Sequence, residues 1–120
     1  MLIRSQNKAF LLNFGNLTVA YIVKNDEGFV ISSLEGENRY RLGGYSSEVK
    51  AIKVLDMIQG AYMDFEAAKI TSTGLAAAAY TGSYDNPESV AAGIKVLKGY
   101  AEVIRESVVF QMPADSEVVV

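Results

Sequence analysis

Four basic side chains are of a type and spacing that could bind an anionic ligand: Arg39, Arg41, Lys50 and Lys53. The two arginines alternate on a predicted strand, and the two lysines lie on the outer face of a predicted helix. Such a group can contact phosphate oxygens, and Tyr40 and Tyr45 nearby could stack on a base. The sequence therefore contains a candidate nucleic-acid surface.

The overall charge argues against that interpretation. The chain of 120 residues has a formal net charge of -3 and a pI near 4.9. A non-specific DNA binder needs a dense basic face to release counterions. We favour a solvated face whose cations pair with Glu35, Glu37 and Glu48. A nucleic-acid-associated regulator remains an alternative function.

The sequence contains neither cysteine nor histidine. Their absence excludes disulfides, thiolate metal sites and cysteine nucleophiles, and it removes the commonest general base. The acidic turns at 26–27 and 35–37 lack the ligand spacing of a calcium loop. We therefore predict no catalytic residue, no metal and no cofactor, and an enzyme is the least favoured alternative.

A glycine pair, Gly43-Gly44, precedes a predicted helix start at Ser46, where backbone N–H groups could hold an anion. The lysine of a P-loop is missing. We interpret this segment as a tight turn from strand to helix, with Ser46 as the N-cap.

The first 45 residues are predicted to form an antiparallel β-meander. Apolar side chains alternate with polar ones between short turns, and Val19, Tyr21 and Val23 share one apolar face. Short connections between successive strands imply antiparallel pairing. The five predicted strands cover residues 2–5, 9–14, 17–24, 29–34 and 39–42.

After residue 45 the apolar spacing changes to the helical period of 3.6 residues. This pattern predicts amphipathic helices over 47–67 and 86–106. Gly and Thr bracket the alanine-rich segment between them, so we expect a flexible loop over 68–84. Tyr80 and Tyr84 border that loop and are candidate contact residues.

The end of the chain is predicted to return to the sheet. Residues 108–112 are β-branched and aromatic, and Pro113 ends the run. The tail over 113–120 is expected to be frayed. Val96 and Val103 lie off the main apolar stripe of the second helix, which suggests a homodimer contact there.

Three segments resemble a family of small uncharacterised proteins from Gram-positive bacteria and their prophages or mobile elements. They are Ile3-Arg4-Ser5-Gln6-Asn7-Lys8, the run from Leu42 to Glu48 with Ala51 and Val54-Leu55-Asp56-Met57-Ile58, and Val109-Phe110-Gln111-Met112-Pro113. The resemblance covers residues 3–65 and 108–113, and it implies that 66–107 is an insertion. It implies no activity and no functional residue.

These patterns predict one α+β domain over residues 1–120. An antiparallel sheet of about five strands packs against two amphipathic helices, and a final short strand lies near the first. No stretch approaches the roughly 20 apolar residues of a membrane span, so we expect a cytoplasmic protein. We predict a small binding protein, acting through a protein partner or by self-association.

Overall fold

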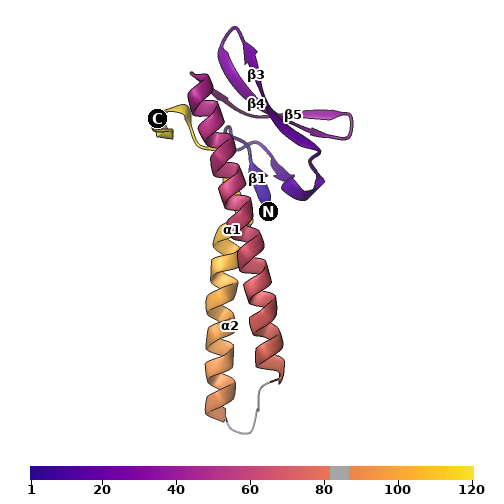
Figure 1. Cartoon of the computed structure of the whole chain (residues 1–120), viewed down its shortest axis with the longest axis vertical. Coiled ribbons are helices and arrows are strands. Elements are labelled where there is room, and N and C mark those ends of the chain that lie inside the picture. The colour runs from indigo at the N-terminus through magenta and orange to yellow at the C-terminus, as the bar shows by residue number, and fades with distance from the viewer. Residues whose placement is uncertain (82–86) are drawn as a thin grey trace. The chain divides into compact units, whose positions relative to one another are not determined.

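The computed structural model describes residues 1–81 and 87–120, with side chains described for 1–71, 108–120 and part of 91–107. Over these residues the fold is α+β, as predicted, with six strands in two three-stranded sheets, a main helix, α1, and a second helix, α2 (Figure 1). The elements are β1 (Leu2–Arg4), β2 (Leu11–Asn13), η1 (Phe14–Asn16), β3 (Val19–Asn25), β4 (Gly28–Glu35), β5 (Asn38–Tyr45), α1 (Glu48–Thr81), α2 (Pro87–Val108), β6 (Val109–Gln111) and η2 (Asp115–Glu117).

The chain divides into two compact units where the sequence led us to expect one domain. The first unit consists of Met1–Ala61 and Val109–Val120, and the second of Tyr62–Val108. The limits of the second unit lie close to those of the segment 66–107, for which the sequence resemblance only predicts an insertion. The first unit holds both sheets and almost all of the candidate site.

The strands do not form a single meander sheet. The order β3-β4-β5 is an antiparallel meander, as the short turns predict. The second sheet has the order β2-β1-β6, in which β6 runs parallel to β1. The final strand thus returns to the first strand, but in a sheet separate from the meander.

One apolar core lies beneath the meander sheet in the first unit. The buried residues of α1 recur at helical spacing, so a single stripe of the helix packs on the sheet. The C-terminal segment completes the core, which contradicts the expectation of a frayed tail over 113–120. The core residues are Ile3, Leu12, Ile31, Leu42, Tyr45, Ala51, Val54, Ile58, Met112 and Val118.

A β-bulge in β5 decides which side chains reach this core. Ile31 of β4 pairs with Gly43 and Ser32 pairs with Arg41, so Leu42 is an extra residue in β5. One extra residue reverses the alternation of side chains between the two faces. Leu42 and Tyr45 therefore both face the core, although their spacing in an unbulged strand would place them on opposite faces.

Helix α1 begins one residue later than predicted and is much longer. Ser47, not Ser46, is the N-cap, because its Oγ accepts the Lys50 backbone N–H at 3.2 Å. The helix continues to Thr81, so residues 68–81 are helical where we expected a flexible loop. The high helix propensity of the alanine run outweighs the glycine and threonines around it.

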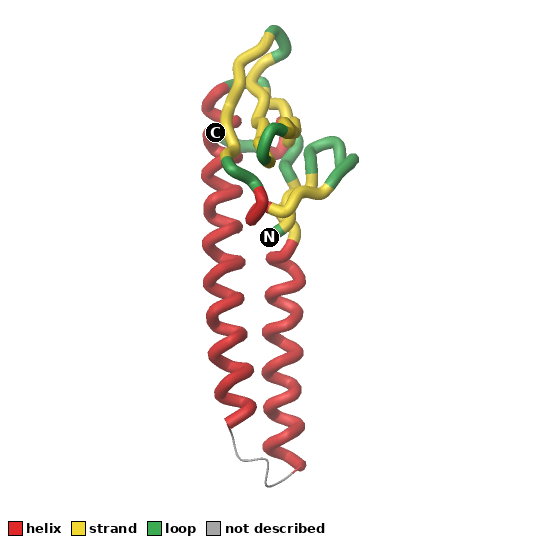
Figure 2. Tube along the Cα trace, turned by 90° about the vertical axis from the view of Figure 1, so that its right-hand side faces the viewer, coloured by secondary structure: helices red, strands yellow, loops and turns green. Residues whose placement is uncertain are grey.

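Within the second unit, the C-terminal part of α1 lies beside α2, and the two helices run in opposite directions (Figures 1 and 2). Helix α2 covers the predicted helix at 86–106, apart from residue 86, and starts at Pro87, where no N–H is needed. Val96 is exposed on α2, and the side chain of Val103 lies outside the described residues.

Candidate functional site

One face of the β3-β4-β5 sheet lies away from the core, and we call it the open face. Residues directly opposite each other in an antiparallel pair point to the same side, so the strand register defines its members. Val19 and Val23 are 42% and 38% exposed, and neither packs against the core cluster. The open face consists of Val19, Tyr21, Val23, Val30, Ser32, Leu34, Arg39 and Arg41, of which Val30 and Ser32 in the central strand are buried.

This face is the one that the alternation of β3 identifies as apolar. In a sheet with one solvated side, such a face normally turns inward. Here the opposite face, which includes Ile22, packs against the core instead. The apolar side chains of β3 on this face, Val19 and Val23, are thereby left exposed in the first unit.

Arg39 and Arg41 lie on the open face, exposed and next to the apolar side chains. Arg41 reaches along its own strand, because a Cβ added to Gly44 would lie 2.8 Å from the Arg41 Nη2. A glycine at position 44 therefore leaves room for the guanidinium group. The two arginines form a basic border along one side of the open face.

Lys50 and Lys53 do not join that border. The Lys50 Nζ donates to the backbone oxygen of Asp115 at 3.0 Å and lies 3.3 Å from the carboxylate Oδ2. The Lys53 Nζ donates to the backbone oxygen of Val119. Both lysines therefore hold the C-terminal segment, so the four predicted cations serve two different purposes.

Tyr45 is not a surface residue, which corrects its place among the candidates. Its side chain is 3% exposed, and its hydroxyl donates to the backbone oxygen of Pro113 at 2.9 Å. Burial raises the pKa of the Tyr45 hydroxyl, and the negative charges of Asp115 and Glu117 raise it further. The bulge explains the error, because simple alternation would place Tyr45 on the side of the two arginines.

The two remaining candidate residues receive no structural test. Tyr80 belongs to α1, but its side chain lies outside the described residues. Tyr84 falls within 82–86 and also lies outside them.

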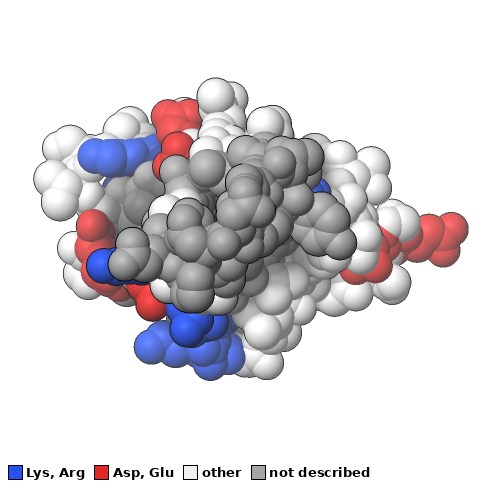
Figure 3. Space-filling view, turned by 90° about the horizontal axis from the view of Figure 1, so that it is seen from below, with Lys and Arg blue, Asp and Glu red and all other residues white. Residues whose placement is uncertain are grey.

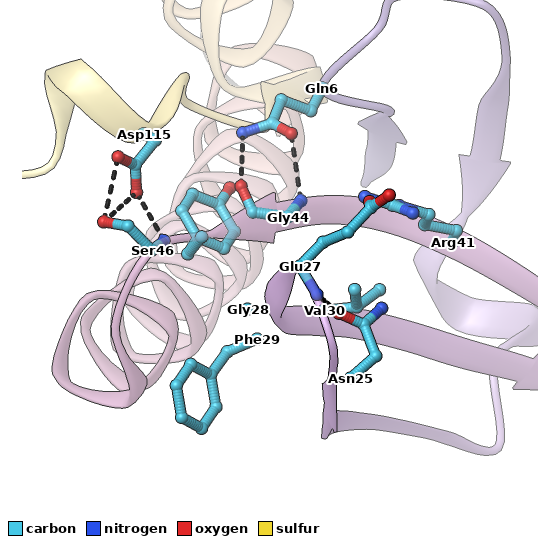
Figure 4. A pocket seen from close by; sticks show the side chains of 11 residues that line it. Gln6, Asn25, Glu27, Gly28, Phe29, Val30, Arg41, Gly44, Ser46 and Asp115 are labelled. Atoms are coloured by element: carbon cyan, nitrogen blue, oxygen red, sulfur yellow. Dashed lines mark hydrogen bonds between the residues drawn. The ribbon is translucent and has the colours of Figure 1, made fainter.

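Sequence reasoning missed Gln6, whose side chain binds the edge of β5. Its Oε1 accepts the Gly44 backbone N–H at 2.9 Å, and its Nε2 donates to the Gly44 oxygen at 3.1 Å (Figure 4). The Nε2 also donates to the Pro113 oxygen at 3.0 Å. The amide thus pairs with the edge of β5 as a neighbouring strand would. A single glutamine between two strand-like runs carries no local signal of this role.

A polar cavity of about 240 Å³ lies beside these bonds. Its wall includes Gln6, Phe29, Arg41, Ser46 and Asp115 (Figure 4). Asp115 accepts the Ser46 backbone N–H at 2.8 Å and the Ser46 hydroxyl at 3.0 Å. These bonds, together with Lys50, lower the pKa of the Asp115 carboxyl.

The cavity favours binding over proton transfer. A general acid at neutral pH needs a raised carboxyl pKa, whereas the pKa of Asp115 is lowered and its oxygens are engaged in structural bonds. Over the residues that the structure describes, no three acidic side chains gather as a metal site requires. A polar ligand could contact Arg41, whose guanidinium group lies in the wall.

Surface charge is mixed on the face that Figure 3 draws. Described basic and acidic side chains occur there in separate small groups of both signs. Among the described residues, no helix combines the length and apolar character that crossing a membrane requires.

Comparison of the chain with protein-family models, curated proteins and solved structures finds no match. The resemblance to small Gram-positive and prophage proteins therefore stays a prediction. The open face and the β5 edge, with Gln6 and the polar cavity beside it, are the features that bear on function.

Proposed function

We propose that this chain is a small cytoplasmic binding protein, of the kind carried by phages or mobile elements, that acts through a protein partner or by self-association. The observation that carries the proposal is the exposure of Val19 and Val23 on the open face. Soluble domains seldom leave a connected apolar surface uncovered, and apolar patches with a polar border are typical of protein contacts. Arginine is also enriched at such interfaces, and Arg39 and Arg41 border this one.

A site-specific photocrosslinker tests this proposal. Placed at Val23, on the open face, it is expected to capture a defined protein or a second copy from a host lysate. The matched control is Val49 on α1, which is also an exposed valine of the first unit, at 60% exposure. Equal capture from both positions, or no capture from Val23, would contradict the proposal.

The variant Arg41→Glu tests whether the protein captured from Val23 docks across the open face. It reverses the charge beside the apolar residues and leaves the core untouched, because Arg41 is exposed. Capture from Val23 should fall with this variant. Unchanged capture would mean that the crosslinked protein does not dock across the open face.

The nucleic-acid alternative keeps only the arginine pair, because Lys50 and Lys53 bind the C-terminal segment. A gel shift at low salt, with Arg39→Ala and Arg41→Ala combined in one variant, examines it. A shift that the double variant abolishes would favour this alternative over a protein partner.

A further inference from the structure

We propose that the outer edge of β3 binds β3 of a second copy of this chain, antiparallel, about a two-fold axis through Ile22. The proposal deepens the proposed function, because β3 also supplies Val19, Tyr21 and Val23 to the open face. Pairing two such edges would join two three-stranded sheets into one continuous sheet across the dimer.

The other edges formed by described residues are blunted. The edge strands of the second sheet, β2 and β6, have three residues each. At the β5 edge, the Gln6 backbone N–H donates to the oxygen of Leu42 at 2.8 Å, beside the bulge, and the Gln6 amide covers Gly44. Short strands, bulges and covering groups are the usual protections against adding a further strand.

Apart from the charge of Lys24, the β3 edge has none of these protections. It is a regular strand of seven residues without proline, glycine or a bulge. In the part of the chain that the structure describes, β4 is its one pairing partner. About half of the backbone N–H and C=O groups of such a strand point outward, ready to pair with another strand.

The sequence of β3 is complementary to itself in this register. With the axis at Ile22, Tyr21 lies opposite Val23 of the second copy, and Lys24 lies opposite Ala20. The one charge of the strand therefore never meets a like charge. Tyr21 and Val23 also come together with their symmetry mates on the open side, where they form an aromatic and β-branched cluster of the type that stabilises sheets. This match argues for a second copy over an unrelated peptide.

Two double variants test the register. Val19 lies opposite Asn25 of the second copy, and both side chains are exposed at opposite ends of β3. Val19→Asp with Asn25→Asp places like charges opposite each other twice across the axis. Val19→Lys with Asn25→Asp places opposite charges at the same two points. The variants share the change at position 25, where aspartate keeps the oxygen that accepts the Glu27 N–H.

Sedimentation velocity over a concentration series is the measurement, with circular dichroism to establish folding. The wild type is expected to dimerise, the Asp/Asp variant to dissociate about tenfold more readily than the Lys/Asp variant, and the Lys/Asp variant to retain the dimer. Val96→Asp on α2 is the control for dimerisation through that helix and should change nothing.

Three results would overturn the proposal. One is a wild type that stays monomeric at millimolar concentration. Another is a dimer that dissociates equally in both double variants, and the third is a dimer broken by Val96→Asp alone. In the monomer case, specific capture of another protein from Val23 would leave the proposed binding function standing, so the two failures are distinguishable.

Discussion

The two edges of the β3-β4-β5 sheet differ in how the rest of the first unit treats them. The β5 edge is bulged at Leu42, paired by Gln6 and tied through Pro113 to the C-terminal segment. The β3 edge is regular and pairs only with β4 among the described residues. The difference indicates that one side of the sheet serves stability, whereas the other is available for contact.

Gly28→Ala should have the largest effect on stability, because the added Cβ would disturb the backbone contact between β4 and the end of β5. Gly28 has φ of 137°, and an added Cβ would lie 2.5 Å from the oxygen of Tyr45. We expect a loss of about 2–3 kcal/mol in the free energy of unfolding, measured by urea denaturation. Gly36→Ala is the matched control, since its φ is 60° and no atom lies within 4 Å of an added Cβ. It should cost only about 1 kcal/mol; equal losses would show that the approach to Tyr45 is unimportant.

Gln6→Ala should open the β5 edge. It removes three hydrogen bonds, of which two reach Gly44 and one reaches Pro113, and we expect a loss of about 2 kcal/mol in urea denaturation. Lys24→Ala on the β3 edge is the counterpart and should change the free energy of unfolding by less than about 0.5 kcal/mol. If the two substitutions cost the same, the contrast between the edges has no energetic basis.

Tyr45→Phe should lower the free energy of unfolding by about 1 kcal/mol, because the Pro113 oxygen loses the hydroxyl that donates to it. The raised pKa of Tyr45 adds a pH dependence: its stabilising contribution is complete below the unfolded pKa of about 10 and declines as pH rises above that value. The wild type should therefore lose stability in alkali more steeply than the variant. Parallel profiles in the two proteins would contradict the buried position of the hydroxyl.

Asp115→Asn should lower the stability most near neutral pH, and its effect should shrink in acid. The folded pKa of Asp115 is lowered, so its contribution is present above the unfolded pKa of about 4 and is lost as pH falls below it. The wild type should lose stability over that acid range, and the variant should lose less. The measurement is thermal unfolding across a pH series; an unchanged acid profile would separate Asp115 from the closure of the β5 edge.

Ser33→Ala should have the smallest effect. Ser33 lies between the edges, paired with Ala20 and Tyr40, and its buried Oγ has no hydrogen-bond partner among the described residues. Removing an unpaired buried hydroxyl should leave the free energy of unfolding unchanged or raise it by up to about 1 kcal/mol. Ser33→Thr, which keeps the hydroxyl and adds volume, should not be stabilising. A substantial loss in the alanine variant would reveal a partner for this hydroxyl.

Local patterns in the sequence identified much of the secondary structure. Alternation and turn residues located β3, β4 and the hairpin between them, and the 3.6 period located the start of α1 to within one residue. The length of α1 was underestimated, because glycine and threonine were weighted above a run of alanines. The division of the strands between two sheets was also not predicted, because the sequence of a short strand does not indicate which strand it will pair with.

The candidate site was predicted only in part. Arg39 and Arg41 lie together and exposed, as alternation implies. Tyr45 was misplaced because a one-residue bulge is invisible to a period-two pattern. Asp115 and Gln6 were missed because their partners lie 69 and 38 residues away in the chain.

By itself, the sequence determined the α+β class, the antiparallel meander and the absence of histidine and cysteine chemistry. Those properties follow from side-chain type and short-range period, which every residue carries locally. Only the tertiary structure decided that the apolar face of β3 points away from the core and that one sheet edge is closed by a distant glutamine. Contacts of that kind depend on which segments meet in space, because burial and pairing are properties of two surfaces together.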